Sequence, residues 1–176
     1  MKHESILVID FGGQYNQLIA RRVRDLHVFA EVVPFEKALK RIDEVHPKGL
    51  IFTGGPNSVY DPASPHADSV IYESGIPILG ICYGAQLVAH QLGGKVKTAP
   101  VSEYGKTILY KKAESAMMKG VSGGSVVWMS HTDYISKPPE GFEITAYTHH
   151  CPAAVIENSD KGWFAARPSG TEDMCK

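Results

Sequence analysis

The sequence predicts an α/β domain with a mostly parallel central sheet, helices on both faces and antiparallel strands added at one side. Short runs of apolar and β-branched residues alternate with segments of helical periodicity in the first half of the chain. These runs are apolar at successive positions, which is typical of strands covered by helices on both faces. Beyond residue 107 the strand-like runs follow one another directly, which indicates antiparallel additions to the sheet.

The first half of the chain is expected to alternate strands and helices. Residues 6–9 form a short apolar run, and the pair Gly12 and Gly13 separates it from a helical segment. The apolar positions that would share one face of this helix are Tyr15, Leu18, Ile19, Val23 and Leu26. The further expected elements are a strand at 32–33, a helix at 36–45 that ends before Pro47, strands at 49–53 and 77–81, and a helix after residue 82.

The second half is expected to consist of strands separated by Gly, Pro and Ser. The apolar runs that predict them lie at 107–110, 126–129, 143–147, 153–156 and 163–166. The sequence contains no internal repeat, low-complexity stretch or long linker, so it predicts one domain.

Composition excludes several classes of protein. The chain has 176 residues, of which 43% are hydrophobic, so it can bury a core without disulfides or a structural metal, and it is neither disordered nor a coiled coil. Its 18 basic and 19 acidic residues give a net charge of -1, which argues against a nucleic acid partner. No apolar run is long enough to span a membrane or to serve as a signal peptide, so we expect no membrane partner and a cytoplasmic location.

Cys82 is the strongest candidate for chemistry. It joins the strand at 77–81 to a helical segment, and Gly80 and Gly84 allow the tight turn that exposes a nucleophile at the carboxyl edge of a sheet. The helix N-terminus would favour the thiolate. The alternative is a small buried hydrophobic residue at the end of a strand, which is the commoner role of a single cysteine. Cys151 and Cys175 are interpreted as structural or incidental thiols, because the three cysteines lack the spacing of a disulfide framework or a zinc site.

A nucleophile that attacks an acyl carbon also needs hydrogen-bond donors for the oxyanion. The amide of Tyr83, directly after Cys82, is one candidate. A second could come from the glycine turn at residues 53–56, although Gly-Gly-Pro alone predicts only a turn.

Five ordered motifs resemble the class I glutamine amidotransferase family, in particular the amidotransferase domains of bacterial GMP synthases. They are residues 10–15 (DFGGQY) with the following 17–22, residues 52–60 (FTGGPNSVY), 79–86 (LGICYGAQ), 103–105 (EYG) and 127–133 (VWMSHTD). The resemblance runs from the start of the chain to about residue 156. It implies a flavodoxin-like fold.

The resemblance also implies an activity. Glutamine would be hydrolysed through a glutamyl thioester on Cys82, with the amides of Gly55 and Tyr83 binding the oxyanion. The ammonia would pass to an ATP-pyrophosphatase synthetase domain or subunit, which uses ATP and Mg²⁺ to aminate XMP to GMP. No cofactor or metal is expected in the amidotransferase domain itself, and oligomers would form only through the synthetase. The residues expected to bind glutamine are Gly54, Gln86, Ser130, His131, Thr132 and Asp133.

The end of the chain departs from the family. Class I amidotransferase domains of this type end in His-Pro-Glu, whose His is the base for the cysteine and whose Glu orients that His. Here residues 167–172 read RPSGTE, so both groups are absent. We therefore divide the chain into an amidotransferase domain at 1–161 and a divergent or foreign tail at 162–176. The tail resembles the phosphate-binding loop of phosphohexomutases, which leaves a phosphate site as an alternative.

Three hypotheses remain open from the sequence. The first is a glutaminase, and the second is a catalytically silent module that binds glutamine or serves as a scaffold. The third is another flavodoxin-like cysteine hydrolase that shares only the turn at Cys82. A different histidine could replace the missing base, and the candidates are His90, His131, His149 and His150.

Overall fold

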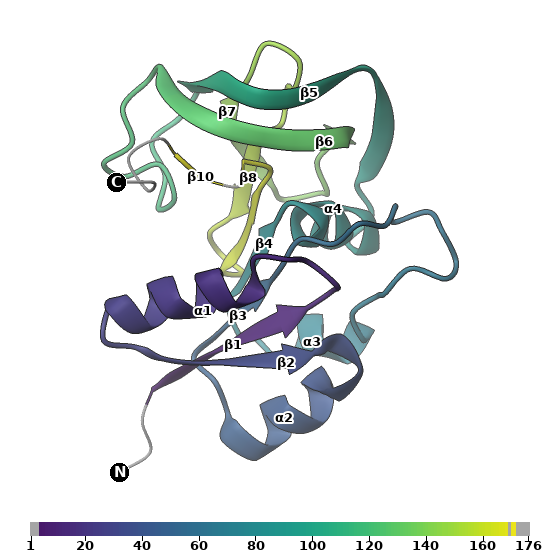
Figure 1. Ribbon diagram of the computed structural model, residues 1–176, viewed down its shortest axis with the longest axis vertical. Helices are drawn as coiled ribbons and strands as arrows, with labels where there is room; N and C mark the ends of the chain where they lie inside the picture. Colours follow the sequence, from purple (N-terminus) through teal and green to yellow (C-terminus); the bar gives the residue numbers. More distant parts are fainter. Residues whose placement is uncertain (1–3, 169, 172–176) are drawn as a thin grey trace.

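The described strands of the protein form one continuous sheet. The structure, a computed structural model, describes residues 4–168, 170 and 171, and the side chains of all of these except 100–103, 131, 170 and 171. Across the sheet the order is β10-β6-β5-β7-β8-β9-β4-β3-β1-β2. Figure 1 shows the long β5 and β6 ribbon crossing one end of the molecule, with β1 to β3 at the other end.

One half of this sheet is parallel. The pairs β1–β2, β1–β3, β3–β4 and β4–β9 are all parallel, as the apolar runs predict. The last of these strands comes from the end of the chain and lies between β4 and β8. The bounds are β1 Ser5–Asp10, β2 Phe29–Pro34, β3 Gly49–Phe52, β4 Ile78–Ile81 and β9 Trp163–Ala166.

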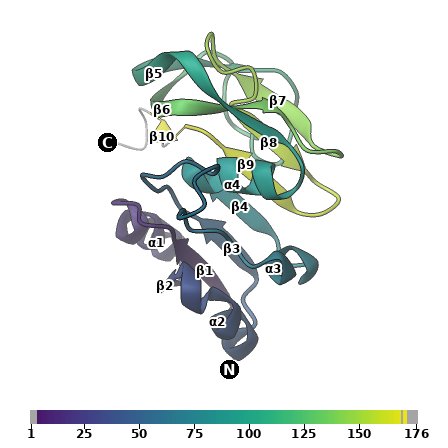
Figure 2. The ribbon, with the colours of Figure 1, turned by 90° about the vertical axis from the view of Figure 1, so that its right-hand side faces the viewer.

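Helices cover both faces of the parallel half, as predicted. The larger core contains residues of α2 (Ala38–Val45), α3 (Ser69–Glu73) and α4 (Tyr83–Gln91) packed on one face of the sheet. A separate cluster joins α1 (Asn16–Asp25) to the other face through Ala20. Figure 2 shows α1 and α3 on opposite sides of the parallel strands.

Two helices differ from their predictions. The helix expected at 36–45 begins with a 3-10 turn, η1 (Phe35–Lys37), before α2. The five-residue α3 lacks a predicted counterpart. Asp68 caps it by accepting a hydrogen bond from the Val70 amide at 3.0 Å, and so short a helix leaves little periodicity in the sequence.

The buried face of α1 is the predicted one only in part, because Ile19 and Val23 pack against the buried cluster around Ala20 while three other predicted positions are exposed. Tyr15 is 58% exposed and Leu26 is 76% exposed, and Leu18 is also exposed. The first two positions fall outside the helix, at its N-cap and C-cap, where the helical periodicity no longer applies. Ala20 is fully buried instead, because a small side chain lets the helix approach the strands closely.

The other half of the sheet is antiparallel, and its strands are longer than predicted. The runs at 107–110 and 126–129 are only parts of β5 (Lys95–Lys111) and β6 (Ser125–Lys137), whose pairing shifts register between Thr98 and Glu103. Cys151 is 2% exposed and belongs to a second core beneath this ribbon, which confirms its structural role. The remaining strands are β7 Glu143–Tyr147, β8 Val155–Asn158 and β10 Gly170–Thr171.

The fold extends past the expected domain boundary at residue 161. Because β9 pairs with β4 on one side and with β8 on the other, Trp163–Ala166 lies inside the sheet rather than in a tail. Residues 172–176 lie outside the described part of the chain, and the divergence of the rest of the tail expected at 162–176 stays a prediction. Among the helices of the described residues, none has the length and apolar character needed to cross a membrane.

Candidate functional site

Cys82 occupies a strained turn between β4 and α4. Its backbone has φ 56° and ψ -112°, a conformation that costs a non-glycine residue about 1–3 kcal/mol. The surrounding backbone holds this conformation. The Cys82 amide donates to the carbonyl oxygen of Ala166 at 3.0 Å, and the Cys82 carbonyl accepts from Ala85 and Gln86 at 3.1 and 3.2 Å.

The two glycines that flank Cys82 are required by close backbone contacts. A Cβ atom on Gly80 would lie 2.5 Å from the carbonyl oxygen of Gly84. A Cβ atom on Gly84 would overlap the carbonyl oxygen of Phe52, since the Gly84 amide donates to the neighbouring Thr53 carbonyl at 2.9 Å. The tight turn predicted from the glycine spacing is therefore present.

Replacing Gly84 with alanine is expected to destabilise the fold. Helix propensity alone would stabilise α4 by up to about 1 kcal/mol, but the clash with Phe52 should cost about 1–3 kcal/mol in excess of that gain. Thermal unfolding should show a midpoint about 3–10 °C lower. Gly123→Ala is the matched control, because a Cβ atom there would meet nothing within 4 Å. Equal melting of the two variants would contradict this account of the turn.

The glycine loop after β3 lies against Cys82. A Cβ atom on Gly54 would be 3.5 Å from the Cβ of Cys82. The loop is fixed at its base by the Thr53 hydroxyl, which donates to the Ile9 carbonyl at 3.0 Å. Among the described residues, neither the Gly55 amide nor the Tyr83 amide donates to an acceptor of the protein. Both amides are therefore available to an anion beside the sulfur.

Burial of Cys82 opposes the thiolate that the helix N-terminus is expected to favour. Cys82 is 8% exposed, and this burial raises the pKa of the thiol to about 11, while the positive charge of Arg167 lowers it. Desolvation therefore outweighs the attraction of Arg167. The Cys82 Sγ donates a hydrogen bond to the carbonyl oxygen of Arg167 at 3.5 Å.

Arg167 stands where the sequence comparison predicts the catalytic base. It directly follows β9, its side chain is 2% exposed, and its amide donates to the Ala154 carbonyl at 2.8 Å. A guanidinium keeps its proton in proteins, so this side chain cannot act as a base.

The predicted glutamine-binding residues are only partly brought together. Gln86 is buried on α4, and its side-chain amide donates to the Asp133 carbonyl at 3.4 Å. Ser130 and Thr132 are exposed on β6, and the side chain of His131 lies outside the described part. Whether these residues and Gly54 hold glutamine stays a prediction.

Comparison with known proteins decides the family of this chain. The family model described as glutamine amidotransferase class-I matches residues 7–166. The chain belongs to the class I glutamine amidotransferase family. The family match thus covers the turn at Cys82, the glycine loop after β3 and β9.

The curated relatives of this amidotransferase domain share one name. The domain is 57% identical over 167 residues to the GMP synthase [glutamine-hydrolyzing] of Clostridium botulinum (strain Alaska E43 / Type E3), and 56% identical to that of Finegoldia magna. Each match covers 95% of this chain and 33% of the relative. The domain therefore spans about a third of the length of the curated relatives it matches.

Solved structures share the fold. A protein from Thermoplasma acidophilum, assigned as one subunit of a GMP synthase, has a TM-score of 0.83 at 26% identity, over 98% of this chain and 88% of that chain. A glutamine amidotransferase from Thermotoga maritima has a TM-score of 0.77 at 18% identity, over 96% of this chain and 76% of that chain. These likenesses confirm the predicted flavodoxin-like amidotransferase fold.

Among the described residues, no histidine forms a hydrogen bond with Cys82 in this amidotransferase domain. His90 lies eight residues after Cys82 on α4, which separates the two by about 12 Å along the helix. The centroid of its ring lies 4.9 Å from that of Tyr60. Burial lowers the pKa of His90, and the charge of His66 lowers it further to a smaller extent. The exposed His149 and His150 pack on each other at 4.7 Å.

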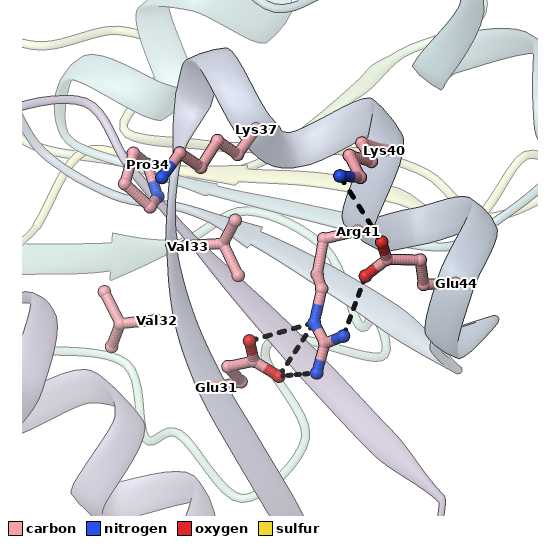
Figure 3. A pocket seen from close by; sticks show the side chains of 8 residues that line it. All are labelled: Glu31, Val32, Val33, Pro34, Lys37, Lys40, Arg41 and Glu44. Atoms are coloured by element: carbon pink, nitrogen blue, oxygen red, sulfur yellow. Dashed lines mark hydrogen bonds and ion pairs between the residues drawn. The ribbon is translucent and has the colours of Figure 1, made fainter.

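A pocket of about 210 Å³ lies between the edge strand β2 and α2, away from Cys82. Figure 3 shows Arg41 reaching across it, between Glu31 on β2 and Glu44 on α2. The Arg41–Glu31 ion pair ties α2 of the amidotransferase domain to the sheet edge. By strand spacing, β2 is roughly 14 Å from β4. Among the described residues, no three His, Cys, Asp or Glu side chains gather as they would around a metal ion.

Proposed function

We propose that this chain is the glutaminase portion of a GMP synthase, in which Cys82 forms a thioester with glutamine. The observation that carries the proposal is the tight turn at Cys82, which lies against the glycine loop at Gly54. Among the described residues, the neighbouring amides of Gly55 and Tyr83 donate to no acceptor of the protein. The relatives at 56–57% identity, named GMP synthase [glutamine-hydrolyzing], support the choice of substrate.

The proposed reaction has two steps. The Cys82 sulfur attacks the amide carbon of glutamine, an S–C bond forms, and the C–N bond breaks. The thiol proton ends on the departing ammonia, so the products are a glutamyl thioester and NH₃. Water then cleaves the thioester and releases glutamate. The amides of Gly55 and Tyr83 would bind the oxyanion in both steps, and Gln86 with residues 130–133 would hold the amino-acid end.

A silent glutamine-binding module is the second candidate, and Arg167 is the observation that favours it. Residue 167 adjoins the thiol but carries no basic lone pair, so proton transfer from Cys82 lacks the expected acceptor. General base catalysis contributes about 10²–10⁴-fold, so we expect the thioester to form and turn over slowly.

The partner of this domain would be an ATP-pyrophosphatase synthetase domain or subunit, which receives the ammonia and aminates XMP to GMP. ATP and Mg²⁺ would bind to that partner, and the amidotransferase domain would need no cofactor. We place the reaction in the cytoplasm, with neither nucleic acid nor membrane as a partner. Oligomers would form through the synthetase.

Incubation with a chloroketone analogue of glutamine tests the proposal. We expect the analogue to label Cys82, as detected by peptide mass mapping, and excess glutamine to protect it. Cys82→Ala is the matched control for glutamate release. An unlabelled Cys82 in folded protein would contradict the glutaminase proposal, whereas labelling with glutamate release no greater than that of the control would identify the silent module.

A further inference from the structure

We propose that Arg167 activates Cys82 by stabilising its thiolate, and so performs by charge a part of the task that a histidine base performs by proton transfer. This inference rests on the proposed function for its role in glutamine hydrolysis. Its physical content, a positive charge acting on the sulfur, can be tested without glutamine.

The backbone brings residue 167 to the nucleophile. The end of β9 presents two successive carbonyl oxygens to Cys82, since Ala166 accepts from the Cys82 amide at 3.0 Å and Arg167 accepts from the Sγ at 3.5 Å. The Arg167 amide is itself bound to Ala154 of the preceding segment, at 2.8 Å. Position 167 is therefore fixed against the sulfur.

The side chain of Arg167 places a permanent charge in a buried setting. The residue is 2% exposed, so solvent and salt screen its charge only weakly. Its attraction lowers the pKa of Cys82, while burial of the sulfur acts in the opposite sense. The thiolate fraction is therefore larger with Arg167 than it would be with a neutral side chain of similar volume.

Two titratable side chains of the described residues on neighbouring elements have partners of their own. From α4, the Tyr83 hydroxyl donates to the Pro65 carbonyl at 2.5 Å. From β6, the Asp133 carboxylate accepts from the Thr98 hydroxyl at 2.9 Å. Among the described groups, Arg167 is the charge that shifts the titration of Cys82.

Arg167 would accelerate only one of the two chemical steps. A larger thiolate fraction speeds attack on the amide carbon, in which the S–C bond forms and ammonia leaves with the thiol proton. A guanidinium cannot accept a proton from water, so it does not assist hydrolysis of the thioester. The expected signature is a thioester that forms faster than it is hydrolysed.

The test compares alkylation of Cys82 in the wild type, Arg167→Lys and Arg167→Met. Peptide mass mapping follows the rates with iodoacetamide, which is neutral, and with iodoacetate, which is negatively charged. In Arg167→Met we expect iodoacetamide to react about 3- to 30-fold more slowly at every pH from 7 to 10, since each unit of pKa shift changes the thiolate tenfold. Arg167→Lys should stay within about 3-fold of the wild type. The ratio of iodoacetate to iodoacetamide rates should also fall in Arg167→Met.

Cys151 serves as the internal control for folding. It is buried in the second core, so its alkylation reports opening of the structure. Equal rates at Cys82 in the wild type and Arg167→Met, with Cys151 protected in both, would overturn the proposal. If Arg167→Met exposes Cys151, the wild type alone provides the test. The ratio of iodoacetate to iodoacetamide rates at Cys82 should then be higher in the folded wild type than in urea, and equal ratios would overturn the proposal. If the chloroketone analogue does not label Cys82 but the alkylation rates still depend on Arg167, only the glutaminase function is rejected.

Discussion

The double substitution Arg167→His with Ser169→Glu should raise glutamate release from glutamine by about 10²- to 10⁴-fold, the usual contribution of general acid–base catalysis. The Arg167 carbonyl lies 3.5 Å from the Cys82 sulfur, so the backbone of a histidine at this position would also lie beside the sulfur. Its neutral imidazole could take the thiol proton and later activate water, which arginine cannot do. The rate is measured as glutamate formed per enzyme at saturating glutamine.

Two controls separate a restored base from other effects. Cys82→Ala in the restored background should abolish the gain, and Arg167→Gln with Ser169→Glu should show none. An unchanged rate in the restored variant, with Cys82 still labelled by the chloroketone, would show that the missing His and Glu do not limit turnover.

Gly55→Ala should slow labelling of Cys82 by the chloroketone analogue by about 10²- to 10³-fold, the usual effect of losing one oxyanion donor. A Cβ atom on Gly55 would lie 2.6 Å from the Phe11 carbonyl oxygen and 3.4 Å from the Tyr83 ring. The loop must move to relieve these contacts, and the Gly55 amide moves with it. The second-order labelling rate of Cys82 measures the loss.

Iodoacetamide supplies the control for this experiment, since its reaction develops no charge on a carbonyl oxygen. Its rate at Cys82 should stay close to that of the wild type in Gly55→Ala. Gly123→Ala, at a glycine with open space around it, should leave both rates unchanged. A parallel loss of both reactions would indicate a general disturbance of the turn and would count against Gly55 as an oxyanion donor.

The turn at Cys82 could be predicted because its requirements are local. Gly80 and Gly84 are conspicuous in the sequence, and each is explained by one backbone carbonyl that a Cβ atom would strike. The apolar runs likewise predicted the parallel strands, because a strand buried on both faces is apolar at successive positions. Family motifs then supplied the flavodoxin-like architecture.

Properties that depend on distant parts of the chain could not be predicted. The protonation of Cys82 is set by burial and by Arg167, which is 85 residues away. The exposure of Leu18 depends on how α1 sits on the sheet, so spacing alone predicted the burial of Ile19 and Val23 but not the exposure of Leu18. The length of β5 follows from pairing with β6 across a shift in register, which the glycine and proline signals near it obscured.

The position of β9 has a consequence for the order in which this protein can be made. Proteins are synthesised from the N-terminus, and β4 is completed long before the strand that becomes its neighbour. Until then β4 is an apolar edge with unpaired backbone groups, which is the type of surface that promotes aggregation. The hydrogen bond from the Cys82 amide to the Ala166 carbonyl can also form only after β9 has been synthesised, so the turn at Cys82 is completed only when the last parallel strand is in place.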